Sequence, residues 1–467
     1  MASEEFSPLT QRTLHRKAVE KQVADRAPGL YAGVARRGVI AWSAGVGSAR
    51  LGEEGWAPDA DTRFSIASNT KTFVAVAIMA LRDEGKLSLD DDLTVHVPES
   101  AHAGVTIRQL LAHVSGMQRE PVGDVWETLE FPDRAGLVVG WNEATRVGRP
   151  HLRHHYSNLS YAMLGEVLCR VDGAERWFDV VERRILQPLG MSSTTLGPAA
   201  DPTANSAAGQ QDRIAGAYFV PPWTDVPRAE PHFLDGAFGA AGALWSTPTD
   251  LARWGGFVAD PVEEVLSPDT FEEMCEPLVM AHGEWELAWG LGFMLWRRGT
   301  QVLVGHTGAY PGSITGVFTH RASATTGLAW ANNSSAVSPG VLAVDLASYA
   351  VEHEPTTPEV WVPGETVPTA YEGVVGPWYS EGRPFTFSVR QGRLEATAPG
   401  QPAWLGPSVF VEVGPDRYLT VKGRERGEEL HVRRNADGEP IALSWATYLF
   451  TRQPMAFGEW KGLIPPR

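Results

Sequence analysis

Hydrophobic positions in the first three quarters of the chain follow both strand-like and helix-like patterns. Two apolar runs near the N-terminus predict strands at 30–35 and 39–46, joined by a turn at Arg37-Gly38. Apolar residues at helical spacing then predict a helix over 69–85, which ends on a glycine. Further helices are predicted at 106–113, 160–171, 177–189 and 342–351, and further strands at 292–296, 301–306, 313–319 and 326–332. This mixture predicts an α/β domain whose later strands form an antiparallel sheet.

The pattern changes after residue 353. The segment 354–369, EPTTPEVWVPGETVPT, is rich in proline and acidic residues and has no periodicity, which is typical of a linker. Short alternating runs follow and predict strands at 385–390, 393–397, 409–413, 418–421, 429–433 and 442–451. The chain is therefore expected to comprise one α/β domain (1–353), the linker, and a small all-β, lipocalin-like barrel domain (370–467) that the linker can let fold over the first domain.

Composition and charge exclude several classes of protein. The chain has 40 Lys and Arg against 56 Asp and Glu, a formal net charge of −16, which disfavours a nucleic-acid partner. No apolar run reaches 18 residues, so no membrane partner is expected. The N-terminal residues contain no apolar stretch, which predicts the absence of a signal peptide and a cytoplasmic location.

Neither a metal nor a cofactor is expected. The two cysteines, Cys169 and Cys275, lie too far apart to suggest a disulfide framework or a zinc cluster. His151, His154 and His155 form an H-x-x-H-H run, but no cysteine or carboxylate at ligand spacing accompanies them. These histidines are instead expected to line the approach to the neighbouring Tyr156. Glycine-rich nucleotide motifs at a strand–helix junction are also lacking.

The first candidate catalytic motif is Ser68-Asn69-Thr70-Lys71, at the start of the predicted helix 69–85. Residues three apart share a helix face, so the amine of Lys71 is expected close to the hydroxyl of Ser68. The apolar residues that follow predict burial of the lysine, which would lower its pKa and let it accept the serine proton. Taken alone, the motif fits a capping serine followed by a surface lysine equally well.

The second and third motifs each have a plain structural explanation as well. Tyr156 and Asn158 offer a proton-transferring phenol and an amide that can hold substrate, or simply a turn in which Asn158 caps the next helix. His306-Thr307-Gly308, at the end of an apolar strand, offers backbone N–H groups at an edge, with a glycine that permits close approach. An edge strand with a satisfied histidine explains the same residues.

The three motifs together, in this order, resemble the penicillin-binding-protein and class C β-lactamase superfamily of serine hydrolases. The stretches LLAHVSGM (110–117), RRILQPLGMSSTTLG (183–197) and GHTGAYPG (305–312) look like the same superfamily. The resemblance extends over about 30–351. It implies a β-lactamase-like sandwich: an antiparallel sheet of the five-stranded type beside a helical subdomain, with the active site between them.

The resemblance also implies roles for individual residues. Ser68 is implied as the nucleophile, Lys71 and Tyr156 as the acid/base pair, and Asn158 as a positioning residue. The backbone N–H groups of Ser68 and Ala309 are implied as the oxyanion hole. The catalytic set further includes His306, and Thr307 and Gly308 are implied to bind substrate.

One position departs from the β-lactamase pattern. His306 occupies the place of a lysine whose permanent charge faces the β-lactam carboxylate, and histidine is mostly neutral at pH 7. Penicillin-like anions are therefore expected to be recognised poorly. His-x-Gly is the form found in superfamily members that act as esterases, D-amino-acid peptidases and thioesterases that cyclise non-ribosomal peptides.

The predicted function is acyl transfer through a serine ester, from a small-molecule or peptide acyl substrate. The favoured substrate is a peptidyl thioester with D-residues, for which a carrier protein is a candidate partner, and which is cyclised or released. A carboxylesterase and a D-amino-acid peptidase or amidase are the alternatives; a β-lactamase or a non-catalytic scaffold is less favoured. Four tryptophans, Trp223, Trp245, Trp285 and Trp289, are candidates for an aromatic wall beside an apolar substrate.

Overall fold

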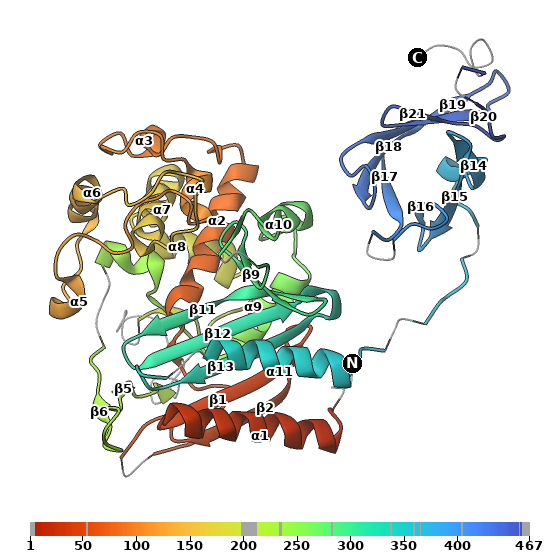
Figure 1. Cartoon of the computed structure of the whole chain (residues 1–467). Helices are drawn as coiled ribbons and strands as arrows, with labels where there is room; N and C mark the ends of the chain where they lie inside the picture. Colours follow the sequence, from red (N-terminus) through yellow and green to blue (C-terminus); the bar gives the residue numbers. More distant parts are fainter. Residues whose placement is uncertain are drawn as a thin grey trace. The chain divides into compact units, whose positions relative to one another are not determined.

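The chain divides into two compact units, Met1–Thr357 and Pro358–Arg467, and each is described by itself (Figure 1). The division lies inside the predicted linker. The computed structural model describes residues 5–52, 55–197, 213–232, 236–281, 284–336, 339–357, 360–364, 366–402, 405–456 and 458–459.

The first unit is built on an antiparallel sheet with the strand order β2-β1-β13-β12-β11-β10-β9-β8. Its strands are β1 (Gly29–Arg36), β2 (Val39–Gly47), β8 (Val279–Met280), β9 (Leu287–Trp289), β10 (Met294–Arg298), β11 (Gln301–Tyr310), β12 (Ser313–His320) and β13 (Thr325–Ala331). The predicted strands are confirmed within a few residues. The sheet is wider than the expected five-stranded type because the chain before β11 folds back as three short strands.

Helices cover both faces of this sheet (Figure 1). On one face lie α1 (Pro8–Asp25) and α11 (Pro339–His353), which pack against each other and enclose an apolar core with β1, β12 and β13. On the other face lie α9 (Pro248–Ala259) and the helical subdomain, which share a larger apolar core with the sheet. The subdomain contains α2 (Thr70–Asp83), α3 (Leu93–His96), α4 (Ile107–Leu111), α5 (Val125–Thr128), α6 (Arg134–Glu143), α7 (Asn158–Asp172), α8 (Trp177–Val181) and α10 (Pro268–Met274). The predicted sandwich is confirmed.

Local sequence explains where the two central helices begin and end. α2 is buried on nearly every side, as expected for a helix whose residues are apolar all round. At the start of α7 the hydroxyl of Ser157 accepts a hydrogen bond from the Ser160 amide at 3.0 Å, so the capping residue is Ser157 and not Asn158. Gly173 ends α7 in the left-handed region, at φ +76°. The helix predicted over 177–189 is α-helical only over Trp177–Val181, and the chain then forms a π-helical turn over Glu182–Leu186.

Short strands tie the loops of the first unit to the sheet and helices. β7 (Leu244–Ser246) pairs with both β3 (Phe64–Ser65) and β4 (Thr195–Leu196), and β5 (Tyr218–Phe219) pairs with β6 (Arg228–Ala229). No helix within the described ranges is long and apolar enough to cross a membrane.

The second unit is an eight-stranded, all-antiparallel, nearly closed barrel whose strands follow one another in chain order. They are β14 (Gly376–Ser380), β15 (Arg383–Arg390), β16 (Arg393–Thr397), β17 (Ser408–Gly414), β18 (Arg417–Lys422), β19 (Glu429–Arg434), β20 (Pro440–Trp445) and β21 (Tyr448–Phe450). Tyr379 and Thr451 exchange backbone hydrogen bonds of 2.8 and 2.9 Å, which bring β14 to the end of β21. Trp378 and Phe387 lie in its core.

The barrel confirms the predicted all-β domain but corrects two details. The single run predicted over 442–451 is two strands, because the chain turns at Ala446 with φ +52°. β14 was not predicted, since a five-residue strand with a proline gives little alternating pattern.

Candidate active site

Ser68 and Lys71 lie together at the N-terminal end of α2. Ser68 is in a 3₁₀ turn, Ala67–Asn69, that leads directly into the helix, and Lys71 follows in the first helical turn. The Lys71 amine donates a hydrogen bond to the Ser68 hydroxyl at 3.0 Å and another to the backbone carbonyl of Ala241. Lys71 is fully buried while Ser68 is partly exposed, so the serine is accessible and its neighbouring amine is not.

Hydrogen bonds fix the turn that carries Ser68 to strand β12. The side-chain amide nitrogen of Asn69 donates to the Ile66 carbonyl at 3.0 Å and to the Thr315 hydroxyl at 2.8 Å. Ala67, between these anchors, has φ +48°, a left-handed conformation that is costly for a residue with a side chain. Because the surrounding bonds hold this conformation, the direction of the Ser68 side chain is set by the sheet as well as by the helix.

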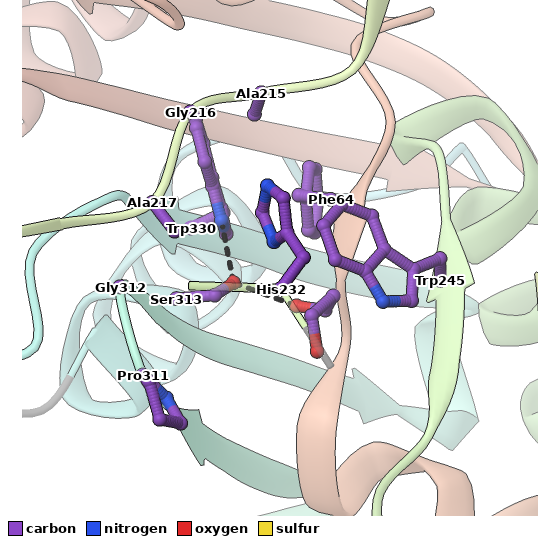
Figure 2. Close-up of a pocket in the computed structure, with 11 residues that line it drawn as sticks. Phe64, Ala215, Gly216, Ala217, His232, Trp245, Pro311, Gly312, Ser313 and Trp330 are labelled. Atoms are coloured by element: carbon purple, nitrogen blue, oxygen red, sulfur yellow. Dashed lines mark hydrogen bonds between the residues drawn. The ribbon is translucent and has the colours of Figure 1, made fainter. Parts of the chain in front are cut away.

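A small pocket beside this turn shows a second anchor (Figure 2). The Trp330 indole donates to the Ser313 hydroxyl at 2.8 Å, and that hydroxyl donates to the Ser65 carbonyl at 2.7 Å. Trp245 and His232 form the other side of the pocket, with ring centroids 5.0 Å apart. The pocket holds only about 10 Å³, close to the space of one water molecule. The hydrogen bonds at its wall connect β3 to β12.

Gly308 lies directly against the serine turn. A Cβ at this position would be 2.4 Å from the Ile66 carbonyl oxygen and 3.0 Å from the Ala67 Cβ. The sequence predicted that this glycine permits close approach, and the structure places the turn that carries Ser68 there.

The tyrosine of the second motif completes the surroundings of the lysine. The Lys71 amine lies 5.0 Å from the centroid of the Tyr156 ring, and the guanidinium carbon of Arg119 lies 5.1 Å from the same centroid. Burial nevertheless raises the pKa of the Tyr156 phenol, an effect larger than the opposing ones of Ser68 and Arg119. Arg119 does lower this pKa, but burial outweighs it, and Tyr156 rests as a neutral phenol.

His113 supports Tyr156 from behind. The two rings are 4.3 Å apart and tilted by 31°. The Nδ1 atom of His113 accepts a hydrogen bond from the Ser157 amide at 3.1 Å, so Nδ1 carries no proton and the ring is neutral. Burial and the charge of Lys71 lower the pKa of His113 in the same sense. His113 lies within the stretch LLAHVSGM, and no motif in the sequence predicts a role for it.

His306 is buried on strand β11, with its ring 5.3 Å from Trp289 and 6.1 Å from Tyr156. Nδ1 donates to the Thr307 carbonyl, and Nε2 has no hydrogen-bond partner within the described part of the chain. Burial and the charge of Lys71 lower the pKa of His306 to about 3, so the ring is neutral at pH 7, as the sequence predicted.

The end of β11 is an edge only over its last residues. β10 pairs with β11 as far as Gly305, whereas β12 pairs with it to Tyr310. Ala309 is exposed on this free stretch and lines the same cavity as Ser68. Side chains alternate along a strand, so Thr307 lies on the face opposite to Gly308 and the serine turn, and its hydroxyl donates to the Met294 sulfur at 3.7 Å. Its predicted contact with substrate does not fit this position.

Asn158 makes contacts that the sequence did not reveal. Its side-chain nitrogen donates to Glu120 Oε1 at 2.7 Å, and its backbone amide donates to the Arg119 carbonyl at 2.8 Å. Its oxygen Oδ1 is buried and lacks a hydrogen-bond partner among the residues described. Asn158 is thus held in one orientation, with an unused acceptor.

A cavity of about 210 Å³ opens beside Ser68. Aromatic rings line it from Trp126, Phe238 and Tyr310, and polar side chains from Arg119, Glu120 and Asn158. The small residues Ala241, Gly242 and Ala309 complete the lining. The aromatic wall expected from four tryptophans is wrong in its members. Trp223 and Trp285 are exposed, Trp245 lines the small pocket of Figure 2, and Trp289 packs behind Tyr156.

The three histidines before Tyr156 are placed separately. His154 stacks on Trp289, with ring centroids 5.0 Å apart and an interplanar angle of 20°, whereas the His151 ring lies 3.0 Å from the Gln109 side-chain amide. The His155 amide donates to the His113 carbonyl. Across the described residues, no group of three or more His, Cys, Asp and Glu side chains is arranged to hold a metal ion.

Comparison with known proteins assigns a family to each unit. Residues 15–347 match the family model described as Beta-lactamase, and residues 367–452 match a domain of unknown function, DUF7586. Protein Rv1367c of Mycobacterium tuberculosis is 30% identical over 247 residues, which are 46% of this chain and 59% of that protein. The match thus spans little more than half of the relative's length.

Solved structures share the fold. A penicillin-binding protein homologue from Pyrococcus abyssi, described as octameric, superposes with a TM-score of 0.61 at 21% identity, covering 94% of this chain and 99% of that one. The D-amino acid amidase of Ochrobactrum anthropi, complexed with D-phenylalanine, gives 0.61 at 22% identity over 74% of this chain and 99% of its own. The family match over most of the chain confirms the resemblance: the chain belongs to the beta-lactamase family.

Proposed function

We propose that this protein hydrolyses amide bonds of small, D-amino-acid-derived substrates through an acyl-enzyme on Ser68. The observation that carries the proposal is the 3.0 Å hydrogen bond between the Lys71 amine and the Ser68 hydroxyl, at the wall of a substrate-sized cavity. The D-amino acid amidase with the same fold supports the substrate class.

The geometry suggests a route for the proton. Along the Ser68–Lys71 hydrogen bond, Lys71, once deprotonated, accepts the proton of Ser68 as the serine oxygen attacks the substrate carbonyl. Tyr156, a neutral phenol beside both groups, donates its proton to the leaving nitrogen and regains one from Lys71. Water then attacks the ester by the reverse sequence and releases the acid.

The negative charge that develops on the carbonyl oxygen needs hydrogen-bond donors in fixed positions. The backbone N–H groups of Ser68 and Ala309 are the candidates, because both residues line the cavity and both are held by the junction of β11 with the serine turn. His306 and Gly308 contribute by position: the first packs behind Tyr156, and the second allows β11 to approach the turn.

Two measurements test the proposal in sequence. A fluorophosphonate should add one label to the wild-type protein and none to Ser68→Ala, as read by intact mass. A panel of a D-phenylalanine amide, a p-nitrophenyl ester, a peptidyl thioester mimic and a chromogenic cephalosporin should then give the highest kcat/KM for the amide or the ester. Failure to label under conditions that label a control hydrolase would exclude the serine mechanism.

The thioester arm of the panel tests the substrate class that the sequence favours, a peptidyl thioester. A peptidyl thioester would use the same serine and lysine, with an internal amine replacing water in the second step. The cephalosporin is expected to be a poor substrate because His306 supplies no positive charge at neutral pH. A cyclic product from the thioester would favour cyclisation over hydrolysis.

A further inference from the structure

Two hydrogen-bond acceptors remain unused at the wall of the Ser68 cavity. Both Glu120 and Asn158 line it, and the Asn158 nitrogen donates to Glu120 Oε1 at 2.7 Å. The other oxygen of each side chain, Glu120 Oε2 and Asn158 Oδ1, is buried and has no hydrogen-bond partner among the described residues. An unsatisfied buried acceptor destabilises the protein, so a ligand that donates to these atoms is bound more favourably.

The charge at this wall is only loosely neutralised. The Arg119 guanidinium contacts Glu120 through a single bond, from Nε to Oε1 at 3.2 Å. The side chain of Arg119 is 62% exposed, and an ion pair in such a position contributes little. Oε1 therefore takes both protein donors, and the second oxygen of the carboxylate stays available for another cation.

From these contacts, the geometry points to a subsite for a positively charged amino group on the acyl side of the substrate, formed by Glu120 and Asn158. An ammonium group carries three N–H donors and no acceptor, which matches two acceptors and a negative charge. Glu120 lines the cavity with a side chain that is 28% exposed, so its carboxylate is within reach of a bound amine. Glu120 is a specificity residue in this arrangement and takes no part in bond breaking.

The rest of the cavity defines the group that accompanies the amine. Trp126, Phe238 and Tyr310 line the same space, and Phe131 stacks behind Phe238 with centroids 5.4 Å apart. An apolar side chain fits such aromatic surfaces. The substrate class is therefore an aminoacyl amide or peptide with a free N-terminal amine and an apolar first side chain.

This inference rests on the proposed function, since the amine must lie on the acyl group that Ser68 receives. The competing possibility is that Arg119 binds a substrate carboxylate and Glu120 only positions Arg119. In that case, neutralising Glu120 would affect substrates with and without an amine equally.

The experiment compares matched anilides in the full-length protein. D-Phenylalanine p-nitroanilide carries the amine, 3-phenylpropionyl p-nitroanilide lacks it, and N-acetyl-D-phenylalanine p-nitroanilide blocks it. The wild type should favour the free amine over both others by at least about tenfold in kcat/KM at pH 7. Glu120→Gln should reduce kcat/KM for the amine substrate by at least about tenfold and change the other two less than about threefold. Glu127→Gln, an exposed carboxylate on α5, is the matched control and should leave all three unchanged.

A pH profile separates recognition of charge from a structural effect. The preference of the wild type for the amine substrate should fall above about pH 8, where an α-amino group loses its proton. Turnover without any preference for the amine, or equal losses on all substrates in Glu120→Gln, would overturn the subsite and leave the proposed function standing. Absence of fluorophosphonate labelling and of turnover on every anilide would overturn the proposed function itself.

Discussion

At the scale of single residues, this site depends on which groups burial keeps neutral. His113, Tyr156 and His306 all have pKa values shifted away from charge, and burial is the largest cause for each. They surround Lys71, which is fully buried and bonded to Ser68. The amine thus lies among neutral rings. The charged side chains that line the cavity beside it are Arg119 and Glu120.

Replacing the lysine tests its role directly. Lys71→Ala should lower kcat by about 10³-fold or more, because the Ser68 hydroxyl then has no base within hydrogen-bond distance. Lys71→Met keeps more of the buried volume and should show the same loss, whereas Lys86→Ala, at an exposed lysine, should retain full activity. Circular dichroism checks that the variants fold. More than a tenth of the activity remaining in both Lys71 variants would contradict the assignment.

The low pKa of His306 predicts how stability depends on pH. The unfolded chain binds a proton at this residue below about pH 6.5, whereas the folded protein binds it only near its pKa of about 3. The free energy of unfolding contributed by His306 is thus fully present above pH 6.5. As the pH is lowered from 6.5 to about 3, this contribution to the free energy of unfolding should fall by about 1.4 kcal/mol per pH unit.

Urea unfolding at several pH values between 4 and 7 measures this dependence. His306→Gln should flatten the slope by that contribution, while His431→Gln, at a half-exposed histidine of the barrel, should leave it unchanged. An identical slope in His306→Gln and wild type would show that the imidazole titrates normally in the folded protein.

At the scale of elements, the site is made where two structures meet: the turn that begins α2, and the part of β11 that continues beyond β10. Asn69, Ser313 and Thr315 bind the turn to β12. Gly308 lets β11 lie close to the turn, because a Cβ at this position would be only 2.4 Å from the Ile66 carbonyl oxygen. Neither element alone would hold Ser68 opposite Ala309.

Adding one methyl group at this junction should separate the two elements. Gly308→Ala is expected to lower kcat/KM by about 100-fold, because a shift of the serine turn by about 1 Å misplaces the nucleophile. Fluorophosphonate labelling should slow in parallel. Gly140→Ala, at a glycine of α6 with open space around it, is the control and should keep full activity. Normal labelling of Gly308→Ala would mean that the junction adjusts without affecting Ser68.

At the scale of the whole molecule, each of the two units has its own hydrophobic core. The first unit contains the cores on both faces of the sheet, and the barrel is filled by its own residues, among them Trp378, Phe387 and Trp445. The contacts described for Ser68, Lys71 and Tyr156 all come from the first unit. The residues to which the proposed chemistry is assigned therefore all lie in the first unit.

A chain ending at Thr357 tests this independence. It should fold, take up one fluorophosphonate label and hydrolyse a p-nitrophenyl ester within about threefold of the full-length rate, because the contacts described around the site are retained. Thermal unfolding followed by circular dichroism gives the folding control. A folded but unlabelled first unit would show that the barrel contributes to the active site. A selective loss of large substrates would show that it governs access.

The sequence by itself determined the fold class, the positions of most helices and strands, and the set formed by Ser68, Lys71, Tyr156 and Asn158. The helices and strands follow from local periodicity, and the candidate set follows from the resemblance of three motifs, taken together, to a known superfamily. The tertiary structure alone decided which distant groups surround that set: His113 behind Tyr156, the Thr307 hydroxyl on the far face of β11, and Glu120 at the cavity wall. It also decided which groups stay neutral, because desolvation depends on what packs around a side chain after the chain has folded.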